Sequence, residues 1–121
     1  MKNILVTAFV ILALFSGAVN AQDNIEKKKI EFLISSVENL KGAKFIRNGL
    51  EHDGKEAAEH LRIKLLKAGS MVQTADDCIR LCACKSFITG KPYMIRLSAG
   101  KTIKSEEYFR EKLKEYISTV K

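Results

Sequence analysis

Four stretches of the chain place apolar residues three and four positions apart, which is the spacing of an amphipathic helix. Three of them lie at about residues 23–40, 53–69 and 74–85, and the fourth begins at Ser105. We therefore predict four helices that share one core. Its expected apolar stripes are Ile30, Leu33, Ile34, Val37 and Leu40 in the first helix, Ala57, Ala58, Leu61, Leu65 and Ala68 in the second, and Phe109, Leu113, Tyr116, Ile117 and Val120 in the fourth.

The two middle helices carry clear start signals. Asp53 and Thr74 are residue types that cap the free N–H groups of a helix, and Glu56 and Asp77 follow three residues later. Gly69 is suited to end the second helix, because glycine readily adopts the left-handed conformation found there. The sequence therefore predicts a capping box at the start of each of these helices.

Two short segments, residues 44–47 and 93–97, are the candidates for strands. Pro92, the only proline, restricts the backbone just before the second segment. Strands this short are marginal alone, so we expect them to pair with each other against the helices. The predicted fold class is α+β, mainly α, with four helices and two short strands in one small domain.

The N-terminus has the pattern of a secretory signal peptide. Lys2 precedes a nearly unbroken apolar run over residues 4–15, and small residues then lead to Ala21. The run is shorter than the roughly 20 apolar residues that a permanent membrane helix requires. We expect cleavage after residues 1–21, a single domain over residues 22–121 without a transmembrane span, and a periplasmic or secreted location. An uncleaved N-terminal anchor is the alternative.

The net charge of +7, or +6 without residues 1–21 and their Lys2, is a moderate basic surplus. Such a surplus attracts anionic partners over a long range. The basic residues are interleaved with acidic ones, however, as solvated helix faces are. With 7% aromatic residues and no tryptophan, we expect no specific nucleic-acid binding. The partner classes that remain are a small molecule, a protein and an anionic component of the cell envelope.

Three cysteines lie close together in the sequence CIRLCAC. Cys78 and Cys82 share one face of the predicted helix, whereas Cys84 points almost opposite to Cys82. Buried reduced thiols are the leading interpretation. A Cys78–Cys82 bridge fits helical Cβ directions poorly, although a disulfide or an intermolecular bridge remains open. The spacing does not match that of a zinc site.

Acidic residues and two histidines surround the start of the second helix. Glu56 and His60 are four residues apart on one helix face, and Glu51 and His52 come just before the cap. Together they could form a nitrogen and oxygen site for a divalent metal. Because the spacing is not that of H-E-x-x-H and capping already accounts for Glu56, we predict no metal and no other cofactor.

The segment before that helix is rich in binding chemistry. Arg47 and Asn48 precede Gly49 at a turn, and an arginine there can hold a carboxylate or phosphate through its planar fork. Lys85 and Ser86 suggest a nucleophilic pair, but neighbouring residues on a helix point about 100° apart. We predict a polar cleft lined by Arg47, Asn48, Glu51, His60, Lys85, Ser86 and Tyr93.

The segments KFIRNG, EAAEHLRIKL and TADDCIRLCACKSFITGKPYMIRL occur in an order and at intervals that carry a family resemblance. From about Ile30 to Tyr116, the chain resembles the YfeK-like family of small exported bacterial proteins, whose domain has no known function. The resemblance implies export and small size, and it implies no chemistry. His52 stands where this family often has an aromatic residue, and Cys84 stands where it usually has serine, so the resemblance implies that neither is an essential reagent.

These observations favour a small exported binding or interaction module without catalytic activity. One alternative is a small hydrolase or metal-dependent enzyme that uses Arg47, His60 and Lys85, which requires a perturbed pKa in a real pocket. The other is a binder of anionic surfaces or polymers, which requires the basic surplus to gather on one face.

Overall fold

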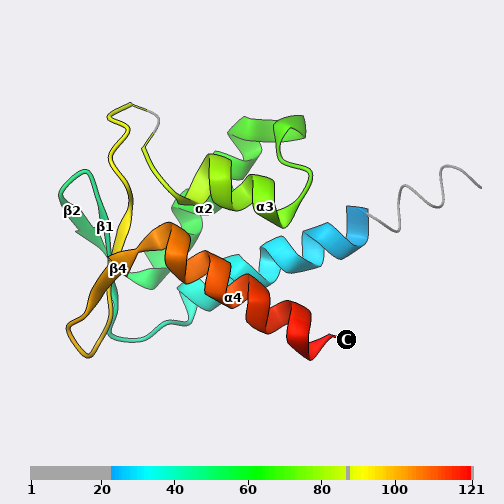
Figure 1. Cartoon of the computed structure of the whole chain (residues 1–121). Coiled ribbons are helices and arrows are strands. Elements are labelled where there is room, and N and C mark those ends of the chain that lie inside the picture. Colours follow the sequence, from blue (N-terminus) through cyan, green and yellow to red (C-terminus); the bar gives the residue numbers. More distant parts are fainter. Residues whose placement is uncertain (1–22, 87, 121) are drawn as a thin grey trace, which may run out of the picture.

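The computed structural model describes residues 23–86 and 88–120, and these form helices around one end of a small antiparallel sheet (Figure 1). The signal peptide predicted for residues 1–21 lies outside this part of the chain. No helix within the described ranges has the length and apolar composition needed to cross a bilayer.

The described helices and strands follow one another along the chain with short connections. The first helix covers residues 23–38 of the described part. It is followed by β1 (Lys44–Arg47), β2 (Leu50–His52), α2 (Gly54–Ala68), the 3₁₀ turn η1 (Gly69–Met71), α3 (Ala75–Cys78), its π-helical continuation η2 (Ile79–Ala83), β3 (Met94–Arg96), β4 (Thr102–Lys104) and α4 (Ser105–Thr119). The prediction of an α+β, mainly α domain with four helices is confirmed.

Both predicted capping boxes are present. The Asp53 side chain accepts a hydrogen bond of 2.8 Å from the Glu56 backbone N–H, and the Glu56 carboxylate accepts one of 3.3 Å in return. Thr74 and Asp77 form the same reciprocal pair at the start of α3. Gly69 ends α2 with a φ of 54°, in the left-handed region that favours glycine.

The sheet has the strand order β2-β1-β3-β4, with every neighbouring pair antiparallel. The predicted pairing of the two strand candidates is confirmed as the central pair, β1 with β3. The prediction of only two strands is wrong, because β2 and β4 flank this pair. These edge strands have three residues each, Leu-Glu-His and Thr-Ile-Lys, which are too short to show a period of two.

The strand register decides which side chains face the helices. Phe45 lies opposite His52 on β2 and opposite Ile95 on β3, and Ile95 lies opposite Ile103 on β4. Phe45 and Ile95 are buried in the core. Because side chains two residues apart share a face, Arg47 lies on the same inner face as Phe45.

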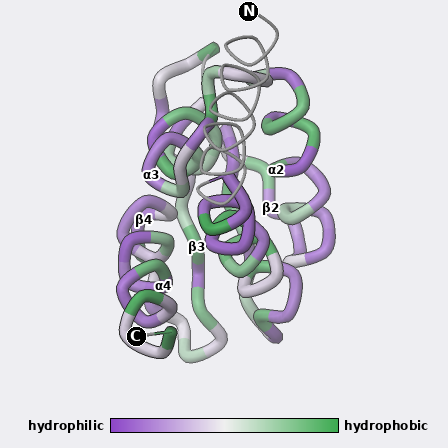
Figure 2. Tube along the Cα trace, turned by 90° about the vertical axis from the view of Figure 1, so that its right-hand side faces the viewer, coloured by the Kyte–Doolittle hydropathy of each residue, from purple (hydrophilic) through white to green (hydrophobic). Residues whose placement is uncertain are grey.

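The apolar core lies between this inner face and the helices, and it contains Leu33, Ile34 and Val37 of the first helix. Figure 2 shows hydrophobic positions recurring between hydrophilic ones along α2 and α4, as expected for helices with one buried face. Cys78 and Cys82 are buried, Cys84 is half-buried, and none of the three forms a disulfide.

The predicted stripe of the fourth helix is only partly buried. Tyr108 and Phe109 fill the core near the start of α4, whereas Ile117 and Val120 are exposed. The prediction that these last two residues are buried is wrong, because the final turn of α4 extends beyond the core.

The cap of α2 yields a stability prediction. Asp53→Ala removes the acceptor for the Glu56 N–H, so it should lower the free energy of unfolding by about 1 kcal/mol. Urea denaturation measures this difference. Asp53→Asn is the matched control, because asparagine caps as well as aspartate does. Equal losses in the two variants would contradict a capping role.

Candidate functional site

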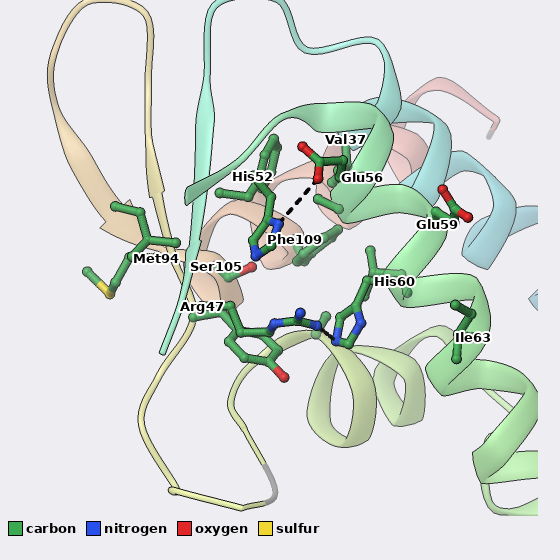
Figure 3. A pocket seen from close by; sticks show the side chains of 16 residues that line it. Val37, Arg47, His52, Glu56, Glu59, His60, Ile63, Met94, Ser105 and Phe109 are labelled. Carbon is green, nitrogen blue, oxygen red and sulfur yellow. Dashed lines mark hydrogen bonds and ion pairs between the residues drawn. The ribbon is translucent and has the colours of Figure 1, made fainter. Parts of the chain in front are cut away.

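A cleft of about 270 Å³ opens between the inner face of the sheet and α2 (Figure 3). Its walls are largely apolar and include Phe45, Leu61, Ile63 and Phe109. Six of the polar side chains that line it are the ones that carry its chemistry: Arg47, His52, Glu56, His60, Tyr93 and Ser105.

Arg47, the last residue of β1, joins the sheet to α2. Its guanidinium donates a hydrogen bond from Nη1 to Nε2 of His60 (Figure 3). The protein has five arginines, and within the described residues Arg47 is the one without a carboxylate partner. The other four pair with acidic side chains, namely Arg62 with Glu31 and Glu38, Arg80 with Asp76 and Asp77, Arg96 with Glu51, and Arg110 with Asp76 and Glu106.

His60 lies in a strongly positive environment. Burial lowers the pKa of His60, and the positive charges of Arg47 and other nearby basic groups lower it further, to about 4. The ring is therefore neutral at pH 7. Because its Nε2 accepts the hydrogen bond from Arg47, the ring proton must be on Nδ1.

His52, the last residue of β2, contacts the start of α2. Its Nδ1 lies 3.6 Å from Oε2 of Glu56. Its Nε2 is buried and has no hydrogen-bond partner among the described residues. A buried polar atom left unpaired costs about 1–3 kcal/mol, so this nitrogen is a feature that the fold alone does not account for.

Tyr93 connects the cleft to a nearly buried lysine. The Lys64 ammonium donates to the Tyr93 hydroxyl at 2.9 Å and to the Lys85 carbonyl oxygen at 3.4 Å. The rings of Tyr93 and His60 meet edge to face, with their centroids 6.4 Å apart. Lys64 thus adds a second positive charge behind this wall of the cleft.

Two of the other predicted site residues form a separate cluster. The Thr89 hydroxyl donates to Asn48 Oδ1 at 2.7 Å, and Asn48 Nδ2 donates to Ser86 Oγ at 3.5 Å. Ser86 is buried, and its Oγ also accepts a hydrogen bond from the Ile88 backbone N–H. This cluster ties the β1–β2 turn to the loop before β3.

The remaining two predicted residues also lie away from the cleft. Glu51 belongs to the outer face of the sheet, where it forms a two-bond ion pair with Arg96 at 2.8 and 3.0 Å. Lys85 is exposed and does not line the cleft.

The structure therefore brings together Arg47, His60 and Tyr93, and it adds four polar residues that the predicted cleft lacked: His52, Glu56, Glu59 and Ser105. The sequence feature that could have pointed to His52 is its place directly before the Asp53 cap. The position of His52 on the inner face, however, depends on the pairing of β2 with β1. Among the described residues, no group of three histidine, cysteine or acidic side chains is arranged to hold a metal.

Fold and cleft together define a small α+β domain with a largely apolar cleft between an antiparallel sheet and one helix, and Arg47 lies in that cleft without a carboxylate partner among the described residues. The chain belongs to the family of unknown function DUF5329, which it matches over residues 24–117. It is similar to the uncharacterized protein YfeK of Salmonella typhimurium (strain LT2), with 33% identity over 93 residues that cover 77% of each chain. No solved structure matches the chain. The predicted family resemblance is thus confirmed.

The environment of His60 can be tested directly. In an NMR pH titration, the His60 ring should stay neutral from its ordinary pKa of 6.5 down to about 4. Arg47→Gln should raise this pKa, because it removes a nearby positive charge. Arg96→Gln is the control, since Arg96 lies on the outer face and should leave the titration unchanged. An unchanged His60 pKa in Arg47→Gln would contradict the described contact.

Proposed function

We propose that the protein is a small exported binding module whose cleft holds a carboxylate that has an apolar body. The observation that carries this proposal is the state of Arg47. It is the one arginine without a carboxylate partner in the described structure, and it lines the largely apolar cleft.

The anionic end of the ligand is inferred from the charges around Arg47. His60 accepts a hydrogen bond from one N–H group of the Arg47 guanidinium. The other N–H donors of that planar group remain for an oxygen atom of the ligand. Arg47 and Lys64 are both among the causes of the lowered His60 pKa, after burial. A carboxylate placed here would meet a positive field and two-bond geometry.

The apolar body is inferred from the walls of the cleft. Phe45, Leu61 and Phe109 offer hydrocarbon surface below Arg47, and Ile63 extends it along α2. The volume of about 270 Å³ is slightly below the usual range of roughly 300–1,000 Å³ for ligand pockets. The ligand is therefore a small molecule rather than a polymer segment.

A binding role is favoured over the hydrolase alternative, because no general base is hydrogen-bonded to a nucleophile among the described residues of the cleft. His60 directs its bare nitrogen at Arg47 and so does not act as a general base. Lys85 stands outside the cleft, and neither His52 nor Ser105 donates to or accepts from the other. The anionic-surface alternative has weaker support, since most arginines are paired with acidic side chains.

Octanoate is a suitable first probe, and octanamide is its neutral counterpart. Calorimetry should detect binding of octanoate and weaker binding of the amide. Arg47→Gln should weaken octanoate binding by about tenfold or more, since hydrogen bonds to charged groups are among the strong ones. The pKa of His60 should rise when octanoate binds, because a negative charge then offsets the surrounding positive ones.

Arg96→Gln is the matched control for this experiment, because it removes an arginine that the cleft does not contain. It should bind octanoate as the unaltered protein does. Equal binding of octanoate and octanamide, or unchanged binding by Arg47→Gln, would contradict the proposal.

Export is the second part of the proposal, and the pattern around Lys2, residues 4–15 and Ala21 supports it. Mass spectrometry of the protein expressed with its own N-terminus in a Gram-negative bacterium should find a mature chain that begins at Gln22 in the periplasmic fraction. A dominant species that retains residues 1–21 in the membrane fraction would contradict export by cleavage.

A further inference from the structure

At one end of the cleft, the contact between His52 and Glu56 determines which nitrogen of the His52 ring can accept a hydrogen bond. The Glu56 carboxylate lies on the Nδ1 side of the imidazole, 3.6 Å away, so it favours the ring proton on Nδ1. In that tautomer Nε2 is a bare acceptor. It is shielded from solvent and has no partner among the described residues.

The Ser105 hydroxyl lines the same cleft as this nitrogen but is not hydrogen-bonded to it in the described structure, so the two groups form a candidate pair that a ligand could bring together. Ser105 is the first residue of α4, directly after β4, and its backbone N–H donates to the Tyr93 carbonyl oxygen at 2.8 Å. Its side chain lines the same cleft as His52, and Figure 3 shows its hydroxyl directed toward the imidazole ring. In the described structure the hydroxyl forms no hydrogen bond, so its proton is available.

We propose that the ligand of the cleft is a hydroxylated carboxylic acid, whose hydroxyl donates to Ser105 Oγ while Ser105 donates to His52 Nε2. The inference rests on the proposed function, in which Arg47 holds the carboxylate. Because Nε2 can only accept, it takes the one proton of Ser105, and the serine oxygen is left as an acceptor toward the ligand. A hydrogen-bond donor on the ligand completes the chain that begins at Glu56.

The acceptors at this end of the cleft select the kind of donor. The Glu56 carboxylate already faces His52 Nδ1, so Ser105 Oγ is the acceptor offered to the ligand. A ligand ammonium would bring three N–H donors and a full charge against largely apolar walls. A hydroxyl has one donor and no charge, so the inferred class is a hydroxy acid rather than an amino acid.

Calorimetry with matched probes tests the inference. Butanoate, hexanoate and octanoate are each compared with the counterpart that carries a hydroxyl at the far end of the chain. The series of chain lengths is used to find the one that reaches from Arg47 to Ser105. At that length the hydroxyl should tighten binding by about tenfold, as expected for one well-placed hydrogen bond. The corresponding terminal amine should bind more weakly than the hydroxy acid.

Two variants separate this end of the cleft from the carboxylate end. Ser105→Ala and His52→Phe should each abolish the gain from the hydroxyl, measured as the ratio of the affinities of the same variant for the hydroxylated and the plain carboxylate. Thermal unfolding of both variants verifies that they are folded. Phenylalanine is used in place of His52 because it fills the site with a planar ring that has no nitrogen atom to accept a hydrogen bond.

The outcomes distinguish this inference from the proposed function. If plain carboxylates bind and no hydroxylated probe binds more tightly, or if Ser105→Ala keeps the gain, the inference is overturned and the proposed function stands. If neither the plain nor the hydroxylated probes bind, the carboxylate proposal fails and the inference fails with it.

Discussion

The two-residue period of β1 is the constraint on which the site depends. It places Phe45 and Arg47 on the same face of the sheet, so the strand that contributes a ring to the core also carries a guanidinium to the edge of that core. The strand cannot turn Arg47 outward without removing Phe45 from the core. The positive charge beneath α2 is therefore built into the sheet.

The position of α2 follows from its first residues. Asp53 caps the helix directly after β2 ends at His52, and the two elements are joined without a loop. At Gly54 a Cβ atom would collide with the Val37 carbonyl oxygen, so glycine allows α2 to start close against the first helix. This fixed start places His60, two turns into α2, opposite Arg47.

Sequence patterns within a few residues were sufficient to predict the helices and their ends. The cap at Asp53, the glycine at Gly69 and the apolar spacing of the helices could all be read along the chain. The strands β2 and β4 could not, since three residues such as Leu-Glu-His become a strand only by pairing with a neighbour. Tertiary contact, rather than propensity, defines them.

The same limit applies to the site. Arg47 and His60 were recognisable because a turn and a helix surround them, but Glu51 was predicted to line the cleft and lies outside it. Its partner Arg96 lies 45 residues away in sequence, and only the strand register shows that both are on the outer face. That register also turns His52 toward the cleft, which residue spacing alone does not reveal.

An arginine that lines a largely apolar cleft without a carboxylate partner among the described residues departs from the pairing seen at the other four arginines. Such local departures from an otherwise consistent design are characteristic of functional sites. The most direct test is a crystal structure of the protein with octanoate. The account predicts the carboxylate on the Arg47 guanidinium, between β1 and α2, with the alkyl chain along Phe45 and Leu61. Octanoate bound elsewhere, or Arg47 paired with one of the protein's own carboxylates, would contradict it.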